Sequence, residues 1–162
     1  YNRVPNPGSW FTNKDKAWGG VSRDLMPHLL SWIQVFEADY GTLSVKEANT
    51  HQQYNLGTVG STDYGTVDPY GTYDVDDTAV LHYVNSWYTF YCTTSWKNPV
   101  GDKINIEFYK DNELKHTEPL GLCPEDAYEK MVDTAVDNLY NDTYWREQFS
   151  RDVWIHKQLE LL

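Results

Sequence analysis

Hydrophobic positions along this chain recur mostly with a helical period. Between residues 24 and 40, Leu30, Ile33 and Phe36 fall on one face of a 3.6-residue helix. Gly41 follows the last apolar position and supplies a helix stop. The pattern therefore predicts a helix over residues 24–40.

A second, weaker helix is predicted over residues 44–56. Ser44 and Glu47 have the spacing of a capping box, in which each side chain bonds a backbone N–H of the other residue. The apolar face is thin, with Val45 and Ala48 three positions apart. We therefore expect this helix to lie near the surface.

Residues 77–96 fit two interpretations. Val80, Val84, Trp87 and Tyr91 share one face of a helix, which favours a helix. The residue types of the segment (Val, Tyr, Trp, Thr and Phe) instead favour a strand. Because strand alternation is poor, the helix is the preferred prediction.

The C-terminal third gives a clearer pattern. Alternating residues predict a β-hairpin over residues 103–117. Residues 124–140 and 143–160 predict two helices that pair as an antiparallel hairpin. The first of these helices carries a continuous apolar stripe, made of Tyr128, Met131, Val132, Ala135, Val136 and Leu139.

Two segments lack a regular period. Residues 1–20 contain several Pro and Gly residues and predict an extended N-terminal arm. Residues 57–75 repeat Tyr-Gly-Thr and predict a long aromatic and acidic loop. The predicted fold is therefore α+β and predominantly helical. It consists of the arm, residues 1–20, and a single globular domain, residues 21–162.

Charge limits the partners that the chain can bind. The formal net charge is −11, and no Lys or Arg occurs between Lys46 and Lys97. Binding to nucleic acid depends on Lys and Arg contacts to phosphates, so nucleic acid is a poor partner. No apolar run approaches the ~20 residues of a membrane helix, so we expect no membrane span.

Aromatic residues make up 15% of the chain, and several lie outside the predicted helical stripes. Trp and Tyr supply much of the binding energy at protein interfaces. The candidate partner-binding residues are Trp10, Phe11, Trp18, Tyr64, Tyr70 and Tyr73. The leading hypothesis is a non-catalytic accessory subunit of a larger assembly, with other protein subunits as partners. A position peripheral to a membrane complex is compatible with it.

Catalytic motifs are missing from the sequence. It has no His-Glu-x-x-His metal motif, no Gly-x-Ser-x-Gly elbow and no phosphate-binding loop, so we expect neither an enzyme nor a bound cofactor. An alternative hypothesis is a hydrolase with a site around His82 and Asp76.

Another alternative is a secreted glycan-binding module, with calcium assisting the binding. Its metal candidates are the carboxylates of Asp68, Asp74, Asp76 and Asp77, because calcium prefers several oxygen ligands from one flexible loop. This hypothesis expects a disulfide between Cys92 and Cys123, although two free buried thiols fit the sequence equally well.

The chain begins at Tyr1 rather than at a methionine. Removal of a targeting peptide would explain this start, and so would a missing N-terminal segment. With a targeting peptide removed, we expect the interior of an organelle or the extracellular space.

Overall fold

The computed structural model describes residues 4–40, 44–59, 66–84, 89–98, 105–111, 113–119 and 125–162, with the backbone alone at 35–40, 108 and 110. The chain divides into two compact units, residues 1–101 with 150–162, and residues 102–149. The division expected from the sequence, an arm of residues 1–20 and a domain of residues 21–162, stays a prediction.

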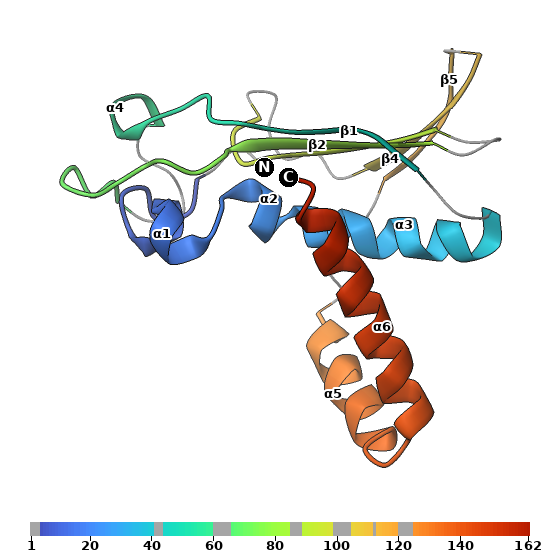
Figure 1. Ribbon diagram of the computed structural model, residues 1–162. Helices are drawn as coiled ribbons and strands as arrows, with labels where there is room; N and C mark the ends of the chain where they lie inside the picture. Colours follow the sequence, from blue (N-terminus) through green and yellow to red (C-terminus); the bar gives the residue numbers. More distant parts are fainter. Residues whose placement is uncertain are drawn as a thin grey trace. The chain divides into compact units, whose positions relative to one another are not determined.

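The first unit is built on a three-stranded antiparallel sheet in the order β1-β2-β3. Figure 1 shows α2 and α3 along one face of this sheet. The elements of the unit are, in chain order, the 3₁₀ helix η1 (Trp10–Thr12), α1 (Lys14–Ala17), α2 (Val21–Asp24), α3 (Met26–Tyr40), β1 (Ser44–His51), α4 (Leu56–Val59), β2 (Thr78–Val84) and β3 (Thr89–Ser95).

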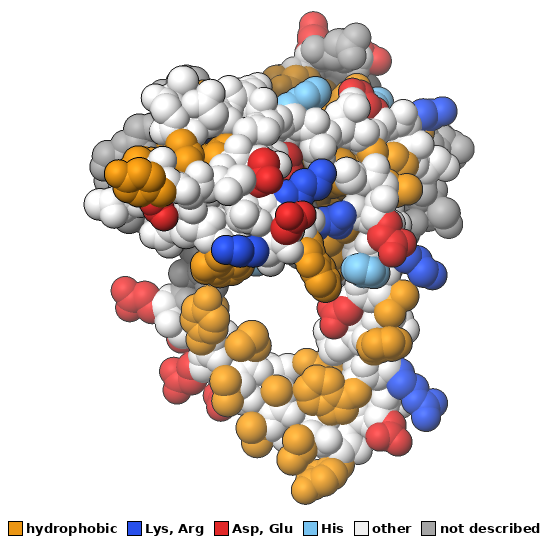
Figure 2. All heavy atoms as spheres, turned by 60° about the vertical axis from the view of Figure 1, so that its left-hand side comes forward, with side chains coloured by type: hydrophobic (Ala, Val, Ile, Leu, Met, Phe, Trp, Pro, Cys, Tyr) orange, Lys and Arg blue, Asp and Glu red, His pale blue; other side chains and the backbone are white. Residues whose placement is uncertain are grey.

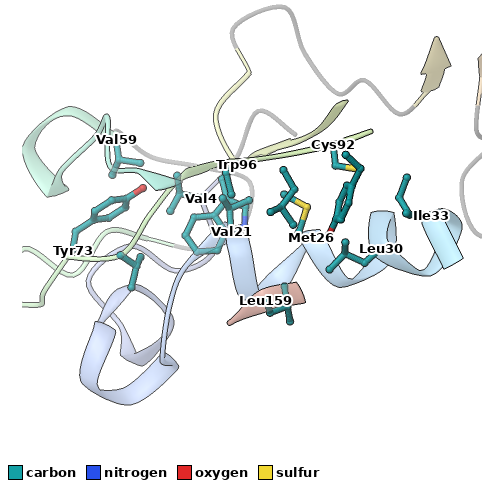
Figure 3. Packing of buried hydrophobic residues seen from close by; sticks show 14 residues of the cluster. Val4, Val21, Met26, Leu30, Ile33, Val59, Tyr73, Cys92, Trp96 and Leu159 are labelled. Carbon is teal, nitrogen blue, oxygen red and sulfur yellow. The ribbon is translucent and has the colours of Figure 1, made fainter. Parts of the chain in front are cut away.

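The hydrophobic core lies between this sheet and the helices (Figure 3). In the central strand β2, Ala79, Leu81 and Tyr83 alternate toward the core and are buried. The end of α6 (Asp142–Leu159) adds Leu159 to the same cluster, and Gln158 Oε1 accepts a hydrogen bond from the Tyr83 hydroxyl at 3.1 Å. The other buried hydrophobic residues are Val4, Val21, Met26, Leu30, Ile33, Val59, Tyr73, Val75, Cys92 and Trp96.

The helix predicted over residues 44–56 is wrong, because residues 44–51 form strand β1. The pairing of β1 with β2 shifts between Val45 and Glu47, which marks a β-bulge. Val45 pairs with Tyr83 and Ala48 pairs with Leu81, so both face the core side of the sheet. The bulge therefore gives a strand the three-residue apolar spacing that is typical of a helix.

The helix predicted over residues 77–96 is also wrong, because β2 and β3 form an antiparallel pair there. Buried positions alternate within β2, and in β3 Cys92 and Thr94 face the core while Tyr91 and Thr93 are exposed. The preference of these residue types for strands is therefore the sequence feature that agrees with the structure. The helical period predicted over residues 77–96 extends across two separate strands, β2 and β3. The buried positions of the two strands are not in phase with each other, so one period cannot describe both.

The second unit contains the predicted hairpin, β4 (Asn105–Lys110) paired with β5 (Glu113–Pro119). It continues into α5 (Ala127–Asp137), and residues 142–149 of α6 also belong to it. Figure 1 shows α5 and this part of α6 running in opposite directions. The Trp145 indole N–H donates to the Asn138 carbonyl at 2.8 Å, which fixes the turn between the two helices.

A predominantly helical fold is wrong for this chain, because the described residues also form a three-stranded and a two-stranded antiparallel sheet. The extended arm also needs correction, since η1 and α1 lie within it, and α4 opens the predicted long loop. The predicted helix over 24–40 corresponds to α3, with α2 before it. In the part of the chain that the structure describes, no helix combines the length and apolarity needed to cross a bilayer.

Cys92 gives the core a measurable pH dependence. Burial raises the pKa of its thiol from 9.0 to about 12. The stability that the neutral thiol contributes is therefore complete below pH 9.0 and is lost as the pH rises toward about 12. We expect the difference in free energy of unfolding between wild type and Cys92→Ala, measured by urea denaturation, to shrink by up to about 1.4 kcal/mol per pH unit in this range. A difference that does not change with pH would show that the folded thiol ionises normally.

Candidate functional site

The predicted partner-binding aromatics are not all equally accessible. Trp10, Trp18 and Tyr70 are 60%, 83% and 96% exposed. Phe11 is half-buried, with its ring 5.0 Å from Trp10 and 5.6 Å from Trp96. Tyr73 is buried in the core, and Tyr64 lies outside the described residues. Of the five candidates that the structure describes, three are therefore exposed to solvent.

The backbone that carries Trp10 is fixed against residues 66–77 of the same chain. Gly8 and Thr72 form an isolated antiparallel bridge. The Thr12 hydroxyl is fully buried in this contact, where it donates to the Thr72 carbonyl at 2.7 Å and accepts from the Gly8 N–H at 2.8 Å. The arm is therefore part of the first unit rather than a free tail.

Two glycines allow this close backbone contact. A Cβ on Gly71 would lie 1.8 Å from the carbonyl oxygen of Gly8, and a Cβ on Gly8 would lie 2.3 Å from that of Asp68. Gly8 also has φ +92°, a conformation that other residues rarely adopt. The second Tyr-Gly-Thr of the predicted loop is therefore a packing site for the arm.

Asp68 and Asp74, two of the metal candidates, bond backbone amides instead. The Asp68 carboxylate accepts from the Tyr70 N–H at 3.0 Å and so fixes a local turn. The Asp74 carboxylate accepts from the Lys14 N–H at 2.7 Å, at the start of α1. Both side chains are exposed, and each holds backbone close to one of the exposed aromatics.

The Asp76 carboxylate serves the start of α2. It accepts from the N–H groups of Gly20 at 2.8 Å and Ser22 at 2.7 Å, and from the Ser22 hydroxyl at 3.1 Å. The Asp76 carbonyl accepts from the Val21 N–H at 2.9 Å. Side chain and backbone together satisfy donors at a helix start that otherwise lack partners. Glycine is required at residue 20, since a Cβ there would lie 1.8 Å from the Asp76 carbonyl oxygen.

Asp77 is fully buried and bonds a different part of the chain. Its carboxylate accepts from the N–H groups of Gln53 and Tyr54, at 3.0 Å and 2.9 Å, and from the Tyr73 hydroxyl at 3.1 Å. Burial, with the Asp77 charge and hydrogen bond, raises the pKa of Tyr73, so its hydroxyl stays a donor. A buried carboxylate is tolerated only with such donors.

These contacts give the four aspartates structural roles. Each carboxylate faces N–H or O–H donors of the surrounding chain rather than the other carboxylates. Across the described ranges, no group of three His, Cys, Asp or Glu side chains is arranged to hold a metal ion.

His82 and Asp76, the pair of the hydrolase alternative, are not brought together. His82 lies in β2 on the outer face of the sheet, where its ring stacks on Tyr91 at 4.2 Å between centroids. Asp76 is bonded to α2, which contacts the core side of the sheet. The described geometry therefore does not place Asp76 where its carboxylate could orient His82.

One exposed apolar surface lies outside the predicted partner-binding residues. The apolar stripe predicted for the helix over residues 124–140 lies on α5 and is open to solvent, with exposures from 55% to 76% for Tyr128, Met131, Val132, Val136 and Leu139. Figure 2 shows hydrophobic side chains gathered over α5 and the adjoining part of α6. An acidic residue recurs every four positions beside this stripe, at Glu125, Glu129, Asp133 and Asp137.

Comparison with known proteins gives no relative: no family model matches the chain, and neither does any curated protein or solved structure.

The buried Asp77 carboxylate predicts a large stability effect. We expect Asp77→Asn to lower the free energy of unfolding by about 2–4 kcal/mol, because an amide NH₂ would replace one acceptor oxygen facing buried donors. The exposed Asp68→Asn is the matched control, with an expected loss under about 1 kcal/mol. Urea denaturation of both variants checks this, and equal losses would contradict the role given to Asp77.

Proposed function

We propose that this protein is a non-catalytic subunit that binds a partner protein through Trp10, Trp18 and Tyr70. Large aromatic side chains supply much of the binding energy at protein interfaces. These three are exposed, although the backbone that carries them is held by hydrogen bonds to the aspartates and by the arm contact. Such a surface loses little conformational entropy when a partner binds.

Trp18 carries the proposal. It ends α1 with φ 61° and ψ 12°, the left-handed conformation, in which Gly or Asn is the favoured residue. A bulky side chain there is strained by about 1–2 kcal/mol, and Trp18 is also 83% exposed. Neither backbone preference nor burial accounts for a tryptophan at this position, whereas contact with a partner would.

Phe11 and Tyr73 take no part in the proposed surface. Both pack on the chain itself, so the sequence-based expectation that aromatics of the arm and loop need a partner applies only to the exposed ones. The glycan-binding alternative draws on the same exposed aromatics, which can stack on sugars. It also expects a Cys92–Cys123 disulfide, and Cys92 is a free buried thiol, while Cys123 lies outside the described residues. This difference favours a protein partner.

Trp18→Asn separates stability from binding. Asn tolerates the left-handed conformation, so we expect the free energy of unfolding to stay unchanged or to rise by up to about 1 kcal/mol. The same variant should lose a protein that copurifies with the wild-type chain in stoichiometric amounts from its native source.

Trp32→Ala is the matched control, since Trp32 is a 47% exposed tryptophan on α3. It should keep the copurifying protein. A wild-type chain that purifies alone, or a partner retained equally by Trp18→Asn and Trp32→Ala, would refute the proposal.

A further inference from the structure

The exposed face of α5 belongs to the second unit, whereas the arm belongs to the first. Tyr128, Val132 and Val136 follow one another at four-residue spacing, so they form a continuous apolar row along the helix. Met131 and Leu139 widen it, and Phe149 of α6 is also exposed, at 69%. A helix of a soluble domain normally turns such a stripe toward a core. Here the described residues leave it open to solvent.

An acidic row runs beside the apolar row. Glu125, Glu129, Asp133 and Asp137 each lie three positions before an apolar or aromatic residue, so the two rows are neighbours on the helix surface. Of these four acids, none forms an ion pair among the described residues. The salt bridge of α5, from Lys130 to Asp126 at 2.7 Å, involves neither row.

This arrangement does not help the isolated helix. Like charges four positions apart repel each other, and exposed apolar side chains gain nothing from solvent. Two copies of the face would also place acidic rows near each other. A surface that is apolar along one line and acidic along the next complements an apolar helix that carries basic residues along one side.

We infer that the α5 face binds a basic amphipathic helix of a partner protein. The apolar residues of that helix cover Tyr128, Val132 and Val136. Its Lys or Arg residues, spaced at four positions, lie along Glu129, Asp133 and Asp137. The inference goes beyond the function proposed above, because it concerns a different surface and does not depend on Trp18.

Two synthetic peptides test this with the full-length chain. The first is a fluorescent helix of about 18 residues with a Leu stripe and a row of Lys at four-residue spacing. Its twin has Glu in place of every Lys. In fluorescence anisotropy titrations, we expect the basic peptide to bind at least about tenfold more tightly than its twin, and its affinity to fall as salt rises.

Substitutions in the apolar row and the acidic row test whether the basic peptide binds at the α5 face or is attracted by the negative charge of the whole protein. The double variant V132S/V136S removes apolar contacts and keeps a similar helix propensity, and should weaken basic-peptide binding at least about fivefold. Asp133→Lys should weaken the basic peptide and strengthen its twin. Asp15→Lys, which makes the same charge change on α1, should leave both affinities nearly unchanged, as should Trp18→Asn.

Three results would overturn the inference. The first is equal affinity for the two peptides. The second is an equal response to Asp133→Lys and Asp15→Lys, which would indicate unspecific charge attraction. The third is a dimer in sedimentation velocity that V132S/V136S disperses, which would assign the face to a second copy of the chain.

Discussion

The first unit depends on two consecutive aspartates, Asp76 and Asp77. Their carboxylates accept hydrogen bonds from backbone N–H groups of two segments that lie on opposite sides of the dipeptide. The Asp76 carboxylate bonds the start of α2, whereas the Asp77 carboxylate bonds residues 53 and 54 beyond the end of β1. The backbone of Asp77 adds two further contacts, donating to the His51 carbonyl at 2.9 Å and accepting from the Trp96 N–H at 3.0 Å. Neighbouring residues of an extended chain point in opposite directions, so one dipeptide can join these segments.

This junction explains how the described part of the predicted extended arm is fixed to the rest of the first unit. Residues 20–22 reach Asp76 across more than fifty positions of the chain, and Gly20 is the residue that lets the backbones approach. The exposed aromatics are therefore displayed on a framework that is already folded. The negative charge of residues 68–77 contributes to that framework through hydrogen bonds that the carboxylates accept from N–H groups.

The sequence predicts elements well where one period runs through a single element. Helices α3, α5 and α6 and the β4–β5 hairpin follow such periods. The prediction fails at β1, where a bulge moves Val45 and Ala48 to one face, and at β2 and β3, two antiparallel strands whose buried positions differ in phase. The roles of Asp76 and Asp77 could not be predicted from the sequence, for a related reason. A cap is recognisable from sequence when it lies beside its helix, and the backbone N–H groups that these carboxylates bond lie more than twenty positions away.

Amphipathicity, by itself, also does not say what covers an apolar face. The α5 stripe has the pattern of a core helix, and the described residues leave it exposed. The acidic row beside it is the feature on which the inferred docking of a basic helix rests.

Native-state amide hydrogen exchange of the full chain tests the central claim most directly. If Asp76 and Asp77 join the arm and the end of β1 to the sheet, the amides of Gly20, Ser22, Gln53 and Tyr54 will exchange with opening free energies close to those of β2 and β3. Exchange of these four amides at the rate of an unstructured chain, with β2 and β3 still protected, would contradict it.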